Sequence, residues 1–151
     1  MVWSIKMPST YIRNSSNLLV GIGILAIALG LFLVFFRPLF VFLPEDVKFI
    51  GATATDVVLY NSALIHWIQF VFRSWGAFVF STGVLVTGVA AYPYRRNEKW
   101  AKIILGVAGI PMLLIFGLVN YFLGSNFFLI IIAVGLLYTA IIIFSLLHNK
   151  K

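Results

Sequence analysis

The stretch Pro44–Arg73, PEDVKFIGATATDVVLYNSALIHWIQFVFR, decides the fold, because it is the one long run that fits neither a lipid bilayer nor a short connection between membrane spans. It holds three of the four acidic residues, one of the two histidines and the basic residues Lys48 and Arg73. Leu, Ile, Val and Phe dominate the rest of the chain. We therefore expect this stretch to form a polar-edged cap on one end of a bundle of membrane-spanning helices.

The composition on both sides of this stretch is typical of an integral membrane protein. The 151-residue chain is 62% hydrophobic and only 10% charged, whereas soluble domains have roughly 25% charged residues. Its net charge of +7 does not indicate nucleic-acid binding, since the basic residues form small groups between apolar runs and no nucleic-acid-binding motif is present. The absence of cysteine excludes disulfides, thiolate metal sites and cysteine nucleophiles.

Four apolar runs are long enough to cross a hydrocarbon core of roughly 30 Å at about 1.5 Å per helical residue. They cover approximately residues 18–36, 74–92, 103–122 and 127–147. The first run exceeds the core of a cleavable signal peptide, so we expect it to remain as a span. The polar residues 14–17 offer N-caps just before it. The predicted fold is all-α: a single membrane domain, residues 1–151, with a four-helix transmembrane bundle and an outer cap over residues 37–73.

Turn and capping signals predict short helices within the cap. The range Pro44–Asp46 suits a helix start, because proline fits the first turn and acidic residues suit the positive N-terminal end of a helix. Thr53 and Asp56 have the spacing of a capping box. From Ser62 onward, apolar residues recur at helical spacing, which predicts either an amphipathic interfacial helix or the outer end of the second span.

The basic residues predict how the bundle is oriented, because loops rich in lysine and arginine stay in the cytoplasm. Three of the eleven lie on the side of the cap, namely Arg37, Lys48 and Arg73. The other eight lie on the opposite side: Lys6, Arg13, Arg95, Arg96, Lys99, Lys102, Lys150 and Lys151. We expect a multi-pass protein of the cell (inner) membrane with both termini in the cytoplasm.

Small residues occur in all four predicted spans. Such residues let helix backbones approach closely in a membrane. Because they are spread over every span, they favour packing within one bundle over a dimerisation face. They include Gly21, Gly23, Ala26, Gly30, Gly83, Gly88, Gly106, Gly109 and Gly135.

The four predicted span cores contain no Asp, Glu, Lys, Arg or His. This disfavours an ion-coupled or proton-coupled transporter, since ionisable residues inside the membrane mark such pathways. A narrow path for a neutral or lipidic substrate remains conceivable, lined by Thr87, Asn120, Tyr138 and Thr139. Hydroxyl groups in a helix, however, can donate a hydrogen bond to a backbone carbonyl of the preceding turn. Near the outer end of its span, the Asn120 amide can hydrogen-bond to interfacial water.

The cap supplies a second set of candidate contact residues. Arg73 either pairs with an acidic residue, which pins the cap to the bundle, or extends to a lipid phosphate. A histidine such as His66, which has no second histidine in the same segment, is more often solvated than a metal ligand, even where acidic residues occur in that segment. We predict no metal site, no cofactor and no catalytic triad, since no nucleophile elbow accompanies these residues. The candidates are Glu45, Asp46, Asp56, His66 and Arg73.

The run Leu43–Gly51 (LPEDVKFIG), followed by Arg73 and a glycine-bearing span, resembles the outer loop of small bacterial four-span membrane proteins of DoxX-like character. The resemblance covers about the first two spans. It implies a four-helix bundle and no assigned reaction. The chain departs from that pattern because neither His66 nor Arg73 is adjacent to an acidic residue.

The leading functional hypothesis is a small integral membrane protein without catalytic chemistry. It acts by protein or lipid contact through its cap, as an accessory subunit of a membrane complex. Two alternatives stay open: a permease or channel for a neutral or lipidic substrate, and a lipid-acting membrane enzyme that uses His66, Asp56 and Arg73. The expected partners are membrane lipids and another membrane protein or a second copy of the chain.

Overall fold

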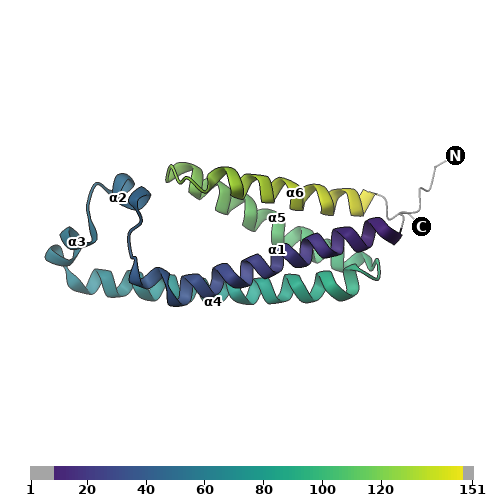
Figure 1. Ribbon diagram of the computed structural model, residues 1–151, viewed down its shortest axis with the longest axis horizontal. Coiled ribbons are helices and arrows are strands. Elements are labelled where there is room, and N and C mark those ends of the chain that lie inside the picture. Colours follow the sequence, from purple (N-terminus) through teal and green to yellow (C-terminus); the bar gives the residue numbers. More distant parts are fainter. Residues whose placement is uncertain (1–8, 148–151) are drawn as a thin grey trace.

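The computed structural model describes residues 9–147, which are largely helical and contain no strand. Four long helices run lengthwise (Figure 1). Each is long and apolar enough to cross a membrane. The protein is therefore an all-α, multi-pass membrane protein with a four-helix bundle, as predicted. The helices are α1 (Ser9–Phe35), α4 (Ser62–Val89), α5 (Lys99–Phe122) and α6 (Phe128–Leu147).

Four shorter elements complete the described chain. The 3-10 turn η1 (Arg37–Leu39) and the helices α2 (Pro44–Ile50) and α3 (Ala54–Tyr60) lie between α1 and α4, and the π-helical turn η2 (Ala90–Tyr94) continues α4. α2 and α3 lie at one end of the molecule, and the first residues of α1 and the last residues of α6 lie at the other (Figure 1). We call these the cap end and the basic end, because Arg13, Arg95, Arg96 and Lys99 belong to the second.

Three long helices begin before their predicted spans: α1, α4 and α5. α1 already includes residues 9–17, so the predicted N-caps at 14–17 are wrong. The reason is tertiary: Ser15 and Ser16 are buried, and the Ser16 hydroxyl donates to the carbonyl oxygen of Ala90 at 2.8 Å. α4 runs without a break from Ser62 through the second predicted span. The segment from Ser62 is therefore continuous with the helix of the second predicted span.

α1 and α4 form one closely packed antiparallel pair. A Cβ atom at Gly30 would lie 2.4 Å from the backbone nitrogen of Phe80, and one at Gly83 would lie 2.6 Å from that of Ile27. Only glycine permits such a backbone approach, which membrane helices use because lipid supplies no hydrophobic driving force between them. Most small residues of the bundle therefore pack internally, as predicted. Gly21 and Gly88 instead face open space.

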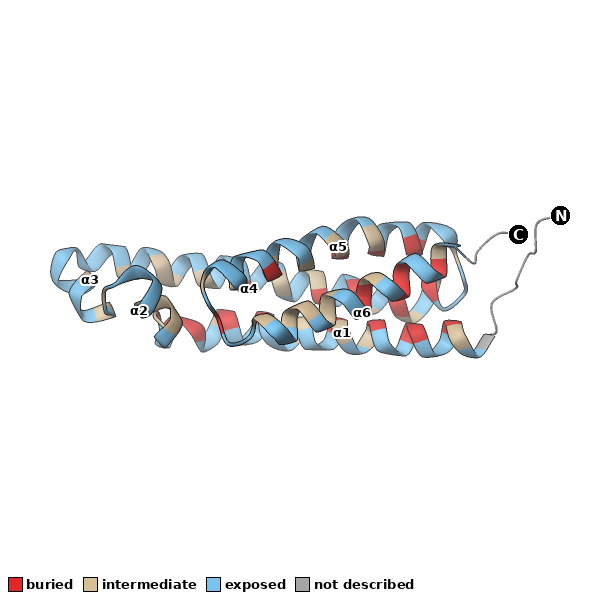
Figure 2. Cartoon of the chain, turned by 90° about the horizontal axis from the view of Figure 1, so that it is seen from above, coloured by how far each residue is buried: buried red, intermediate tan, exposed pale blue. Residues whose placement is uncertain are grey.

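α5 and α6 form a second pair, joined by a tight turn in which Gly124 has a φ of 63°. This pair meets α1 and α4 mainly at the basic end, where the buried core lies (Figure 2). Toward the cap end, Trp75 and Phe116 still meet edge to face at 6.0 Å. The core residues are Ile12, Leu19, Val86, Ala90, Tyr94, Ala101, Leu105, Tyr138, Ile141 and Ile142.

Candidate functional site

Arg37 anchors the cap to the bundle. Its side chain is buried just beyond the end of α1. The guanidinium donates hydrogen bonds to the carbonyl oxygens of Phe40 and Val41, the latter at 2.7 Å. It also forms an ion pair with Asp46 at 2.5 Å and lies 4.3 Å from the ring centroid of Phe72. One side chain thus ties α1, the following turn, α2 and α4 together.

Residues at the start of α2 position the Asp46 carboxylate for its ion pair with Arg37. Pro44 occupies the start of α2, and the Asp46 carboxylate accepts a hydrogen bond from the backbone N–H of Leu43 at 2.8 Å. The helix start and the ion pair therefore use the same carboxylate. Gln69 adds a second link, since its side-chain amide donates to the carbonyl oxygen of Pro38 at 3.0 Å. The predicted start of α2 is confirmed.

The pairing that we considered for Arg73 belongs to Arg37 instead. Arg73 is exposed, and its guanidinium lies 5.7 Å from the ring centroid of Phe70. Among residues 9–147, the ion pair between a basic and an acidic side chain is that of Arg37 and Asp46. The physical reason is position: η1 places Arg37 against Asp46 of α2, whereas Arg73 lies on the exposed side of α4.

The other polar residues of the cap have local roles. The Asp56 carboxylate accepts from the side chain and the backbone N–H of Thr53 at 2.6 and 2.8 Å, which completes the predicted capping box of α3. These hydrogen bonds hold the pKa of Asp56 below its usual value. His66 interacts with Gln69 at 3.3 Å, and Glu45 is half-buried in the first turn of α2. In the described part of the chain, no three His, Asp or Glu side chains gather as a metal-ligand set.

The four candidate residues for a membrane path lie in separate places. Thr87 donates to the carbonyl oxygen of Gly83 on its own helix and packs in the α1–α4 interface. Asn120 likewise donates to Phe116, at 2.9 Å. The buried Tyr138 donates to the carbonyl oxygen of Leu105 across the α5–α6 pair. Thr139 is half-buried on α6. These hydrogen bonds do not link the four residues to one another.

Lys102 was missed by sequence reasoning. The sequence places it in a cytoplasmic connection, but α5 begins at Lys99 and buries Lys102 completely. Its ammonium group donates to the Asn97 side-chain oxygen at 2.5 Å and to the Ser145 carbonyl oxygen at 3.1 Å. The burial of Lys102 depends on Ser145 of α6, 43 residues away along the chain, so no local pattern in the sequence reveals it.

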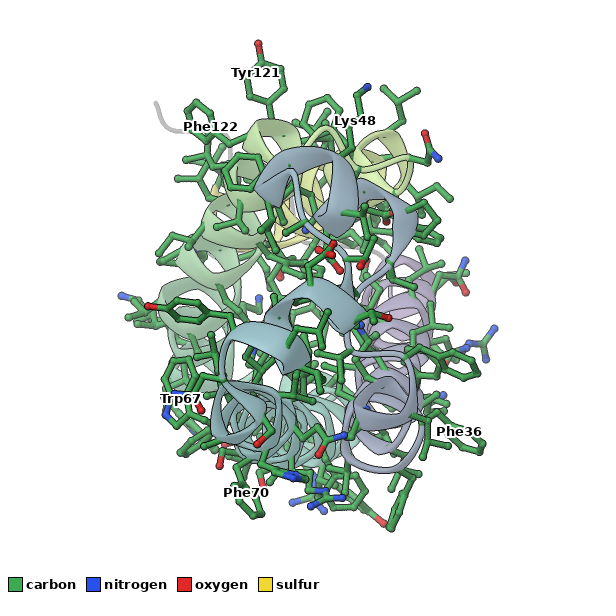
Figure 3. The ribbon with its side chains drawn as sticks, turned by 90° about the vertical axis from the view of Figure 1, so that its left-hand side faces the viewer. Phe36, Lys48, Trp67, Phe70, Tyr121 and Phe122 are labelled. Atoms are coloured by element: carbon green, nitrogen blue, oxygen red, sulfur yellow. The ribbon has the colours of Figure 1, made fainter. Side chains whose placement is uncertain are left out.

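Large apolar side chains are exposed on the cap. Tyr60 is 87% exposed, Leu59 80% and Trp67 61%. Phe49 and Phe70 are also exposed. Figure 3 looks onto the cap end and shows Trp67 and Phe70 pointing away from the bundle axis. The cap therefore combines a buried charged anchor with an apolar outer surface.

Comparisons with known proteins do not identify the chain. No family model, no curated protein and no solved structure matches it. The resemblance of Leu43–Gly51 to DoxX-like proteins therefore stays a prediction from sequence.

Proposed function

We propose that this protein is a non-enzymatic subunit of a membrane complex and that it binds another membrane protein through its cap. The proposal is supported by the exposed apolar side chains of the cap and by the distance along α4 that separates them from the expected membrane boundary. Apolar residues within a span are covered by lipid, so their exposure carries no information about partners. Apolar residues beyond the lipid need a different explanation.

Aromatic and basic residues define the depth of α4. The exposed residues Tyr92, Arg95 and Arg96, centred on position 94, suit one membrane boundary, since such residues favour the interface. Trp75 is about 19 residues away, which is about 28 Å along a helix and close to the roughly 30 Å thickness of the hydrocarbon core. Trp75 therefore suits the opposite boundary.

The cap extends beyond that boundary. Trp67 lies about eight residues farther along α4, or about 12 Å at 1.5 Å per residue. The interfacial layer on each side of a bilayer is only about 5–8 Å thick. The roughly 40 Å of helix from position 94 to Trp67 advances about 38 Å along the membrane normal at the average tilt of about 20°, which places Trp67 about 8 Å beyond the hydrocarbon core. Leu59 and Tyr60 precede the start of α4 and share this outer region.

Protein is the occupant that suits this surface. Exposed apolar patches outside the membrane mark interaction sites, and aromatic side chains are enriched at the centre of protein interfaces. The Arg37 anchor supports the proposal further, because a surface held in place before binding loses less conformational entropy on association. The excess of basic residues at the other end favours a cap outside the cell and termini in the cytoplasm.

Single-cysteine labelling tests the position of the cap. The chain contains no cysteine, so Leu59→Cys and Arg96→Cys each introduce one thiol. A membrane-impermeant maleimide applied to intact cells is expected to label Leu59→Cys and to label Arg96→Cys only after permeabilisation. The reverse pattern would invert the proposed orientation. Equal protection of Leu59→Cys and the span variant Phe78→Cys would place the cap in lipid.

Photocrosslinking tests the proposed partner. A benzophenone maleimide on Leu59→Cys or Trp67→Cys is expected to form one protein adduct of defined mass in native membranes. The same reagent on Phe78→Cys, an exposed position in the middle of α4, should yield mainly lipid adducts. The cap adduct should disappear when Tyr60 is replaced by Ser. Lipid adducts alone at both cap positions would contradict the proposal, and an adduct of twice the chain mass would identify a second copy as the partner.

A further inference from the structure

An open groove runs along the α5–α6 pair near the basic end. It has a volume of about 290 Å³, and its lining residues are Ile103, Gly106, Val107, Ile110 and Pro111 of α5 with Ile142, Ile143 and Leu146 of α6. All of these lining residues are apolar. Gly106 contributes by lacking a side chain, since a Cβ atom there would already lie 3.1 Å from Ile142. The groove thus opens beside a glycine of α5 that lies close to α6.

The dimensions of the groove suit one acyl chain. From Ile103 to Pro111 the helix advances about 12 Å at 1.5 Å per residue. One leaflet of the hydrocarbon core is roughly 15 Å thick. The volume exceeds the roughly 150 Å³ of a cavity that holds benzene. A hydrocarbon chain that lies along the groove would therefore span most of the leaflet at the basic end.

Exposed positive charge stands where the headgroup of such a lipid would lie. Lys99 is four residues before Ile103 and seven before Gly106, so it shares their face of α5. Its side chain is exposed, as are those of Arg95 and Arg96 in the preceding turn.

These cations have no carboxylate partner within the described chain. None of the three forms an ion pair there. The nearby acid, Glu98, instead accepts a hydrogen bond from the indole N–H of Trp100. The buried Lys102 is already bonded to Asn97 and Ser145. The positive charge at the mouth of the groove is therefore available to an anion from outside the chain.

We propose that this groove and Lys99 form a binding site for an anionic phospholipid of the leaflet at the basic end. One acyl chain lies between α5 and α6, and the phosphate contacts Lys99 with support from Arg95 and Arg96. Charge complementarity favours this occupant over a zwitterionic lipid and over a partner helix, which would bring no negative charge to the mouth. The site is at the opposite end from the cap and is independent of any partner protein.

Native mass spectrometry of the full chain, released from mixed micelles, tests the site. The probes are phosphatidylglycerol and phosphatidylcholine with identical acyl chains. We expect preferential retention of phosphatidylglycerol by the wild-type chain. Lys99→Gln should lower this preference about fivefold, the effect of one basic residue near an anionic surface, and Lys99→Arg should restore it. Arg73→Gln, which removes an exposed cation at the cap end, should leave it unchanged.

A second variant tests the groove itself. Val107→Trp places a bulky ring in the groove and should reduce retention of phosphatidylglycerol. Its control, Leu114→Trp, lies on the same face two turns farther along α5, outside the groove, and should behave like the wild type. Helical content by circular dichroism verifies that both variants fold. Equal retention of the two lipids by the wild type, or equal losses in Val107→Trp and Leu114→Trp, would overturn the proposal. Glycerol phosphate, which has no acyl chains, should not compete, and full competition would reduce the site to a surface phosphate contact.

Discussion

Each end of the bundle buries one cation, but the two ends hold it in different ways. At the cap end, Arg37 is paired with the carboxylate of Asp46 and stacked on Phe72. At the basic end, Lys102 is bonded only to neutral acceptors, the Asn97 side chain and the Ser145 carbonyl oxygen. Ser145 lies in the last turn of α6, where the partial negative charge of the helix C-terminus stabilises a cation.

The difference follows from what each cation must hold. Arg37 fixes the short helices α2 and α3, which contain no buried residue, so a direct ion pair and several hydrogen bonds supply the attachment. Lys102 lies where both helix pairs already share an apolar core, so it needs only to satisfy the carbonyl at a helix end. The cap end should therefore depend on single polar groups more strongly than the basic end does.

The largest expected effect comes from separating the two helices that connect these ends. Gly83→Leu places side-chain atoms where the backbone of Ile27 lies, since a Cβ alone would be 2.6 Å from its nitrogen. We expect a loss of more than about 3 kcal/mol, the upper range for overpacked sites. Thermal unfolding in detergent micelles should show both ends disrupted together.

Gly88→Leu is the matched control for this substitution. It lies on the same helix, and no atom falls within 4 Å of its Cβ position. It should unfold like the wild type or slightly later, since glycine inside a helix is unfavourable by about 0.5–1 kcal/mol relative to alanine. Equal losses in the two variants would show that the close α1–α4 packing is not what holds the molecule together.

The second largest loss of stability should come from Asp46→Ala and should be confined to the cap end. Asp46→Ala leaves Arg37 buried without its counter-charge and removes the cap of α2. Loss of one partner of a fully buried pair costs about 3–5 kcal/mol, and the partial exposure of Asp46 lowers our expectation to about 2–3 kcal/mol. The labelling rate of Val41→Cys, a buried position whose carbonyl oxygen accepts from Arg37, should rise as the cap loosens, while the basic end keeps its hydrogen-exchange protection. Glu45→Ala should change neither measurement. Identical behaviour of Asp46→Ala and Glu45→Ala would show that Arg37 does not anchor the cap through its ion pair.

Sequence reasoning recovered what short-range patterns encode. Hydropathy predicts the four spans, because length and apolarity decide whether a helix crosses a membrane. Pro44 and the Thr53–Asp56 box predict the starts of α2 and α3, because caps act over three residues. The buried states of Arg37 and Lys102 were missed. Each depends on a partner from another helix, such as Ser145, 43 residues from Lys102 along the chain, and such contacts leave no local pattern.

A smaller effect is expected at the basic end. Lys102→Met keeps much of the apolar stem and removes two hydrogen bonds, so we expect a loss of about 1–2 kcal/mol. Lys99→Met, at an exposed position one turn away, should stay within about 0.5 kcal/mol of the wild type. The stabilities of the two variants are compared by thermal unfolding in the same detergent. If Lys102→Met loses as much as Asp46→Ala, the two ends do not differ as we argue.

Acid provides the smallest and most local test of the contrast between the ends. The pKa of Asp56 is below its ordinary value because the folded state bonds its charged form to Thr53. Its contribution to the stability of α3 is therefore complete above the ordinary aspartate pKa and is lost as the pH falls below about 4. Amide exchange in α3, corrected for its intrinsic pH dependence, should accelerate in that range, whereas amides around Lys102 should not change. Asp56→Ala should show fast exchange in α3 already at neutral pH, with no further change in acid. Equal protection of α3 at pH 3 and pH 7 in the wild type would contradict the prediction, since the capping carboxylate would then have no role in holding the outermost helix of the cap.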